Sequence, residues 1–174
     1  QSVREINSSI YCMESDFLFN NIGSVSSDNA QGEFYLTDLI GIANSKGARC
    51  MSVTADDCDE IMGVNDRAQL AAASRILRQR INQELMVSGV TIIDPGQTYI
   101  DHGVVIGCDC IIHPNSCISG TTVIGSGCTI EPGASISNCR IGNNCRIKAS
   151  SVLEDSELHD DVSVGPMAHL RPGT

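Results

Sequence analysis

The sequence predicts an α/β portion followed by a left-handed parallel β-helix, with one long helix between them. Three observations support this fold class. An aliphatic residue recurs every six positions from Ile100 onward, a small residue recurs between these positions, and an apolar stripe of helical spacing precedes the repeat. Aromatic residues make up only 3% of the 174 residues and Trp is absent, which favours thin stacked layers over a core of large rings.

The repeat has aliphatic positions that are all Ile, Val or Leu, with two steps shortened to five residues: Ile100, Ile106, Ile112, Ile118, Ile124, Ile130, Ile136, Ile141, Ile147, Val152, Leu158, Val164 and Leu170. The small positions are Val104, Cys110, Ser116, Thr122, Cys128, Ala134, Cys139, Cys145, Ser150, Ser156, Val162 and Ala168. One large inward residue and one small corner residue per six is typical of a β-helix with three strands per triangular coil. An ordinary sandwich would not be expected to keep this register, and we expect about four coils.

Residues 67–87 predict a helix, because Leu70, Ala73, Ile76, Leu77, Ile81 and Leu85 recur at three- to four-residue spacing. Asn65 or Asp66 can cap its start, and Gly89 follows its end. A single apolar stripe must rest on another part of the protein. We therefore interpret this segment as a connecting helix between two domains.

The residues before this helix are typical of an α/β arrangement. Residues 6–13 and 48–54 predict strands, residues 16–22 and 35–45 predict helices, and a polar loop spans residues 26–38. About 65 residues with so few strands are too short for an independent α/β domain. We therefore expect an N-terminal portion to be missing.

Composition limits the classes of partner and indicates the cellular compartment. The net charge of −10 argues against nucleic acid or an anionic membrane, since phosphates would be repelled. No run of 18 apolar residues suggests a membrane span, and the first residues do not resemble a signal peptide. Nine cysteines without secretory features indicate reduced thiols, so we expect a cytoplasmic protein.

The stretch GCDCIIHPNSC, residues 107–117, places three cysteines and a histidine at spacings close to those of a zinc site. The repeat gives another explanation, because its register assigns these side chains to the interior, a corner and the outer surface. Cys128, Cys139 and Cys145 recur in the same small position as Cys110 without a neighbouring histidine. We interpret these cysteines as small apolar residues.

Asn7 and Asn65 are candidate binding residues, each at the end of a predicted element. Asn is common in turns and helix caps, which would explain both positions structurally. Polar clusters at the ends of elements are also where open α/β sheets bind ligands. The residues alone leave both interpretations open.

Several motifs, taken in order, resemble one family along almost the whole chain: EINSSIYCM, DNAQGEFYLTDLI, GVNDRAQLA, GVTIIDPGQTYID and VGPMAHLRPGT. That family is the bifunctional bacterial N-acetylglucosamine-1-phosphate uridyltransferase and glucosamine-1-phosphate N-acetyltransferase. The resemblance implies the C-terminal part of a Rossmann-like nucleotidyltransferase domain at residues 1–67 and a linker helix at 68–88. It implies the first coils of a hexapeptide-repeat acetyltransferase domain at 89–174.

The resemblance also implies the chemistry. The family joins UTP to N-acetylglucosamine 1-phosphate with Mg²⁺, and acetylates glucosamine 1-phosphate from acetyl-CoA in a homotrimer, supplying peptidoglycan and lipopolysaccharide synthesis. By motif, Asn65 would bind Mg²⁺ and the nucleotide sugar. Asn7 would hydrogen-bond the N-acetylglucosamine moiety, with Tyr35 and Thr37 nearby. Arg171 would contact the sugar phosphate, a role suited to a planar and permanently charged donor.

Parts of the family pattern are not found in this sequence. The glycine-rich nucleotide loop, its lysine and the aspartate that shares the metal would precede Gln1, and the catalytic histidine and CoA-binding coils would follow Thr174. His159 and His169 do not match the catalytic histidine by motif. We therefore expect no catalytic residue in this chain, and no turnover by the chain alone in either reaction.

Two other functions remain open from the sequence. One is a related sugar-1-phosphate nucleotidyltransferase with a β-helix, because sugar choice depends on residues outside this chain. The other is a non-catalytic trimerisation module, which a stable trimer that binds no nucleotide sugar would favour.

Overall fold

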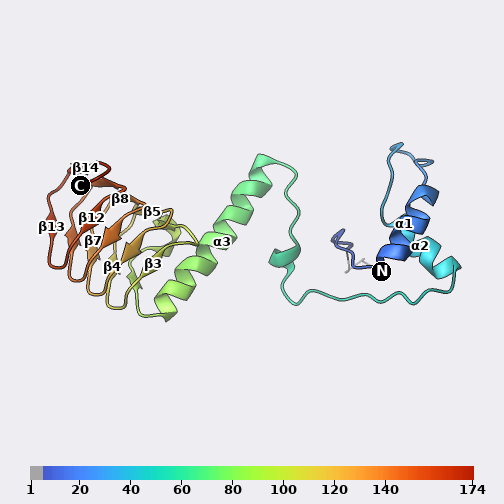
Figure 1. The fold of residues 1–174 in the computed structure, drawn as a ribbon, viewed down its shortest axis with the longest axis horizontal. Helices are drawn as coiled ribbons and strands as arrows, with labels where there is room; N and C mark the ends of the chain where they lie inside the picture. The colour runs from blue at the N-terminus through green and yellow to red at the C-terminus, as the bar shows by residue number, and fades with distance from the viewer. Residues whose placement is uncertain (1–5) are drawn as a thin grey trace. The chain divides into compact units, whose positions relative to one another are not determined.

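The computed structural model describes residues 6–174 of the chain. Its contacts divide into two compact units, Gln1–Asn65 and Asp66–Thr174, and each is described by itself. The first five residues, which include the Glu of the EIN motif, lie outside the described residues. Figure 1 shows the helices of the first unit and the stacked strands of the second.

The first unit contains only helices and irregular segments among its described residues: α1 (Ser15–Asn21), η1 (Ile22–Ser24), α2 (Asp38–Ser45) and η2 (Cys58–Ile61). The two predicted helices are present, although α2 begins at Asp38 and not at residue 35. The predicted strands at 6–13 and 48–54 are wrong, because neither segment is assigned as strand in the structure. A strand is stable only when its backbone pairs with a neighbour, and these two segments do not pair.

A small core holds α1 and α2 together. Leu39 and Ala43 on α2 are buried, and Asn21 at the end of α1 is also buried. The Asn21 amide donates to Phe17 O at 2.6 Å, and its side-chain oxygen accepts a hydrogen bond from Lys46. A buried polar group is stable when it is paired in this way, so Asn21 at the end of α1 also fixes the end of α2.

The second unit begins with α3 (Arg67–Val87), which matches the helix predicted over residues 67–87. The Asp66 side chain caps it by accepting from Gln69 N at 2.7 Å, so of the two candidate caps it is Asp66 that serves. A short turn of helix, η3 (Pro95–Gln97), and fourteen strands follow. Among the described residues, no helix combines the length and apolarity needed to cross a membrane.

The strands are two or three residues long: Thr91–Ile92 (β1), Tyr99–Ile100 (β2), Val105–Ile106 (β3), Ile111–Ile112 (β4), Cys117–Ser119 (β5), Val123–Ile124 (β6), Thr129–Ile130 (β7), Ser135–Ser137 (β8), Arg140–Ile141 (β9), Arg146–Ile147 (β10), Val152–Glu154 (β11), Glu157–Leu158 (β12), Ser163–Val164 (β13) and His169–Leu170 (β14). They form three parallel sheets with the orders β1-β4-β7-β10-β13, β2-β5-β8-β11-β14 and β3-β6-β9-β12. Each strand thus pairs with the strand one coil away, and the predicted β-helix is confirmed. It begins at β1, before the first predicted position.

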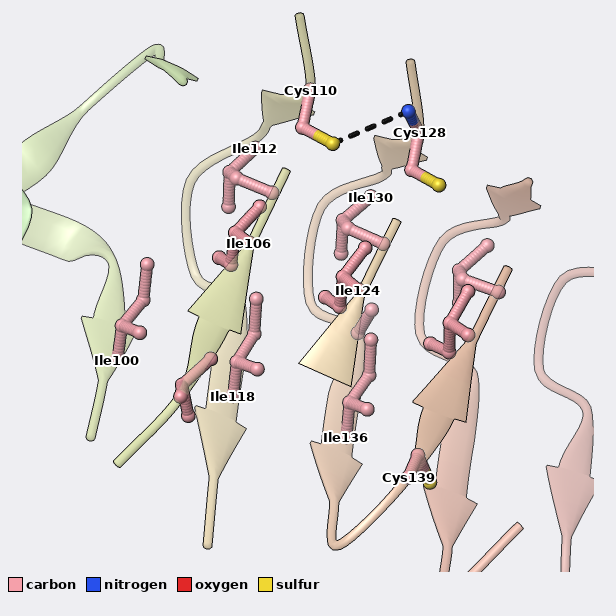
Figure 2. Packing of buried hydrophobic residues seen from close by; sticks show 14 of the residues in the cluster. Ile100, Ile106, Cys110, Ile112, Ile118, Ile124, Cys128, Ile130, Ile136 and Cys139 are labelled. Carbon is pink, nitrogen blue, oxygen red and sulfur yellow. Dashed lines mark hydrogen bonds between the residues drawn. The ribbon is translucent and has the colours of Figure 1, made fainter. Parts of the chain in front are cut away.

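The interior of the β-helix is a column of aliphatic side chains. Figure 2 shows Ile100, Ile118 and Ile136 stacked in one row, with corresponding rows on the other two sheets. Ile112, Ile118, Ile130 and Ile136 are fully buried. Each strand therefore contributes one large side chain to the core, as the six-residue period predicts.

The predicted register is wrong by one residue in a single coil. Leu153, not Val152, pairs with Ile136 and is fully buried, while Val152 pairs with the outward Ser135. The shortened step therefore falls after Leu153. Ser151 accordingly takes the buried corner position predicted for Ser150, and Ser150 lies exposed with a φ of 57°.

The helix α3 packs against the first coil through its C-terminal half. Ile81 belongs to the β-helix core, and Leu85 packs against it, whereas Leu70 and Leu77 of the predicted stripe are exposed. Asn82 is completely buried, and its amide donates to Pro95 O at 2.9 Å and to Thr98 O at 3.1 Å. These bonds fix the helix to the η3 segment.

The Arg78 guanidinium adds a second contact between helix and coil, because it lies 4.4 Å from the centroid of the Tyr99 ring on β2. The Arg78 side chain is long enough to cover the ring with its aliphatic stem and its charged plane. The C-terminal half of α3 is thus held by apolar packing, a buried amide and a stacked arginine.

The corrected register can be tested with a matched pair of substitutions. Leu153→Ala should lower the free energy of unfolding by about 2–5 kcal/mol, because it leaves a cavity in the column. Val152→Ala should cost no more than about 1 kcal/mol, because Val152 faces outward. Chemical denaturation followed by circular dichroism measures both, and a larger loss for Val152→Ala would contradict the register.

Candidate functional site

The structure brings together two of the predicted sugar-binding residues in the first unit. The Asn7 amide donates to Thr37 Oγ1 at 3.2 Å and to the Tyr11 hydroxyl at 2.6 Å. The hydroxyls of Tyr11 and Thr37 lie 2.7 Å apart. A carboxamide, a phenol and an alcohol, all at hydrogen-bonding distance, form what is called here the Asn7 cluster.

Tyr11 is the member of the Asn7 cluster that sequence reasoning missed. Its hydroxyl is bonded to both predicted residues, and the signal that could have found it is its place four positions after Asn7 in the same motif. The position of Asn7 itself is fixed by its side-chain oxygen, which accepts from Ser9 N at 3.0 Å. Asn7 therefore acts in a turn and also presents its amide to the cluster.

The chemistry of the Asn7 cluster is that of neutral hydrogen bonding. Asn7 and Thr37 are exposed, and Tyr11 is partly buried. Carboxamide and hydroxyl groups donate and accept without changing charge near neutral pH. Such an arrangement can orient hydroxyl and amide groups of a ligand, but it supplies no strong acid or base.

The other two predicted residues of this unit are Tyr35 and Asn65. The Tyr35 side chain is partly buried and, within the part of the chain that the structure describes, makes no hydrogen bond to Asn7 or Thr37. Asn65 is exposed. The N-cap of α3 is the next residue, Asp66.

Arg171 follows β14 on the outer face of the β-helix and is exposed. Its backbone carbonyl accepts from the Ser156 hydroxyl at 3.0 Å, which fixes the main chain at this corner. Nearby, His169 Nε2 lies 3.0 Å from Glu154 Oε2 of the preceding coil. That pairing engages the Glu154 carboxylate with His169, and no ion pair to Arg171 is found among residues 6–174.

A second ion pair lies further back along the β-helix. Arg146 Nε donates to Glu131 Oε1 at 2.7 Å, and Ala149 N donates to the other carboxylate oxygen at 3.1 Å. The hydrogen bond from Arg146 lowers the pKa of Glu131 below its ordinary value. These bonds join neighbouring coils, so they are explained by structure and do not indicate a catalytic carboxylate.

The GCDCIIHPNSC stretch does not converge on one point. Cys110 is buried, whereas Cys108 and Cys117 are exposed and His113 is partly buried. Within residues 6–174, no three His, Cys, Asp or Glu side chains are grouped as a metal site of three or more ligands would require. Asn65 is a carboxamide, which suits a hard cation such as Mg²⁺ as one oxygen ligand among several.

An open groove of about 420 Å³ lies along β9 and β12. Arg140, Gly142, Glu157, His159 and Asp160 line it. Charges of both signs meet there, and none of the sequence-predicted site residues contributes to it. The groove therefore does not extend the predicted site.

Comparison with known proteins identifies the family. Residues 121–155 match the family model described as bacterial transferase hexapeptide (six repeats). Along 99% of its length the chain is 71% identical to the bifunctional protein GlmU of Pelobacter propionicus, of which it covers 38%. The chain belongs to the GlmU family. The relationship holds at greater distance, with 46% identity over 98% of the chain to GlmU of Pediococcus pentosaceus, of which 36% is covered.

GlmU of Geobacter metallireducens gives a third comparison, at 52% identity over 98% of the chain and 40% of the relative. The chain thus spans about two fifths of the length of the GlmU proteins that it matches. The matches extend across both units, so the first unit and the β-helix belong to the same family. The word bifunctional in the names of these relatives describes the whole proteins.

The Asn7 cluster can be tested in the chain itself. Tyr11→Phe should shift the side-chain amide resonances of Asn7 and speed their hydrogen exchange, because the 2.6 Å bond is lost. The free energy of unfolding should change by less than about 1 kcal/mol, since the bond is accessible to water. Nuclear magnetic resonance of labelled protein measures the first effect. Tyr35→Phe is the control, and an equal shift in that variant would contradict the cluster.

Proposed function

We propose that this chain is part of a bifunctional enzyme that makes UDP-N-acetylglucosamine. Its first unit would act in uridylyl transfer from UTP to N-acetylglucosamine 1-phosphate, and its β-helix in acetylation of glucosamine 1-phosphate by acetyl-CoA. The observation that supports this most strongly is 71% identity to one bifunctional GlmU along 99% of the chain. The assignment of residues 1–67, 68–88 and 89–174 to the two domains and their linker helix belongs to this proposal.

In the uridylyl transfer, the residues of the first unit would bind and position the substrates. Transfer of a nucleotidyl group needs in-line placement and charge neutralisation more than covalent catalysis. Asn7 and Thr37, held together with Tyr11, would hydrogen-bond the sugar. Asn65 would supply a carboxamide oxygen to Mg²⁺, which neutralises phosphate charge when bound. Tyr35 would line the same sugar site.

In the acetyl transfer, Arg171 would hold the phosphate of glucosamine 1-phosphate. The protein has a net charge of −10, so a phosphorylated substrate needs a local cation. Arg171 is exposed, and its guanidinium can bind phosphate oxygens in a two-pronged geometry. A homotrimer would complete this site with residues from neighbouring subunits, and acetyl-CoA is the acetyl donor in the proposal.

A chimera tests both roles in one protein. Residues 1–174 replace the matching stretch of the Pelobacter propionicus GlmU, and both activities are assayed. Asn65→Ala should lower uridylyl transfer by at least about 10-fold. Arg171→Ala should raise the KM for glucosamine 1-phosphate roughly 10- to 100-fold, as expected for the loss of a charged hydrogen bond.

The contrast between the two variants is the decisive result. Each substitution should leave the other activity unchanged, because the residues lie in different units. Arg140→Ala is the matched control for Arg171, since it removes another exposed arginine of the β-helix and should alter neither activity. Loss of both activities in either single variant, or of neither, would contradict the assigned roles.

A further inference from the structure

Three buried cysteines lie above one another at one corner of the β-helix: Cys110, Cys128 and Cys145, called here the cysteine column. Each directly precedes a strand of the same sheet, and those strands pair in register. The main chain is bonded at each step, with Ile111 N donating to Cys128 O at 2.8 Å and Thr129 N to Cys145 O at 2.9 Å. All three side chains are at most 1% exposed.

The three sulfur atoms repeat one hydrogen bond in successive coils. Each thiol donates to a carbonyl of the next coil, at 3.0 Å to Gly125 O, 3.1 Å to Gly142 O and 3.1 Å to His159 O. The sulfurs of Cys110 and Cys128 each accept from the backbone N–H of the next cysteine, both at 3.3 Å. Equal bonds require equal side-chain conformations, and Figure 2 shows the first of these N–H···S contacts.

Equal conformations fix the distance between the sulfurs. Side chains that repeat from strand to strand are separated by the strand spacing, which is about 4.8 Å. A disulfide needs β-carbons about 3.8 Å apart and sulfurs at about 2.05 Å, so the coils would have to move together by roughly 1 Å. The column is therefore spaced too widely for a disulfide between neighbouring coils.

The same spacing fits one metal ion between two sulfurs. Bonds from thiolate to metal of about 2.3 Å, as for Zn–S, place two collinear sulfurs about 4.6 Å apart. We propose that the cysteine column is a two-coordinate site for a soft, thiolate-seeking cation such as Hg²⁺ or Cu⁺, held between the sulfurs of adjacent coils. Zn²⁺ should not bind there, because it requires four converging ligands.

Charge and proton balance favour a divalent ion. Binding breaks two S–H bonds, forms two metal–sulfur bonds and releases two protons to solvent, with no change of oxidation state. One Hg²⁺ with two thiolates is neutral, which suits a buried site, whereas Cu⁺ would leave one negative charge.

Cys128 is shared by both possible pairs of the column, which limits the site to one ion per chain. Cys110 and Cys145 are separated by two coils, about 9.6 Å, which one ion cannot span. Cys139 is equally buried but belongs to another corner, where its backbone N–H bonds to Thr122 Oγ1 of the preceding coil. Figure 2 shows Cys139 on the far side of the core from Cys110 and Cys128.

The test uses the whole 174-residue chain with its exposed cysteines changed to serine, so that only buried thiols remain. The cysteines changed to serine are Cys12, Cys50, Cys58, Cys108 and Cys117. Hg²⁺ is added without oxygen, unbound ion is removed, and bound metal and released protons are counted. We expect one ion per chain, two protons per ion, and a new sulfur-to-mercury absorbance. Zn²⁺ in place of Hg²⁺ should give no bound ion, no released protons and no new absorbance.

Matched variants decide the location. In this background Cys128→Ser and the double variant Cys110→Ser/Cys145→Ser should each lose the ion that releases two protons, while Cys139→Ser should keep it. Serine is compatible with corners of this kind, because Ser151 and Ser156 are buried at the corresponding positions before strands of the other two sheets. Their hydroxyls donate to carbonyls of the next coil at 2.7 and 3.0 Å. Circular dichroism confirms folding.

Three results would overturn the site. They are retention in Cys128→Ser of an ion whose binding releases two protons, loss of that ion in Cys139→Ser, or absence of such an ion in the background protein.

Discussion

The backbone hydrogen bonds between successive coils are the constraint on which the β-helix depends. They hold residues 17 or 18 positions apart in register, for example Ile112 with Ile130 and Ile130 with Ile147. The pair β1 and β4 is the exception, because Ile92 and Ile112 are 20 positions apart. Because every coil repeats the same pairing, each side chain lies beside its counterpart in the next coil. The inward isoleucines, the small corners and the cysteine column are consequences of this one translation along the stack.

The period of six made the β-helix predictable, because strands of this kind repeat one large residue per side of the triangle. The place of a shortened step was less predictable. Val152 and Leu153 are both aliphatic, so the sequence pattern accepts either as the inward residue. Pairing with Ile136 selects Leu153, and that contact joins residues far apart in the chain. Local pattern therefore predicted the architecture, and long-range pairing determined the register.

The candidate site was likewise predicted from the sequence only in part. Motif resemblance named Asn7 and Thr37, and the structure places them in hydrogen-bonding contact. Tyr11 was not predicted because its role arises from a contact with a residue 26 positions away. The two predicted strands failed because β-branched and apolar residues favour an extended chain only where a partner strand is present. Arg171 remained recognisable by motif alone, since an exposed arginine has no structural signature.

The packing of α3 has a consequence for how one chain can associate with another. A stack of parallel coils ends in unpaired backbone groups, and such an edge can template growth by another molecule. Ile81 closes the apolar column at the first coil, and Asn82 occupies the carbonyls of Pro95 and Thr98. The helix thus covers one end of the stack. A strand from a second chain that approached this end would contact α3 and not an open sheet edge.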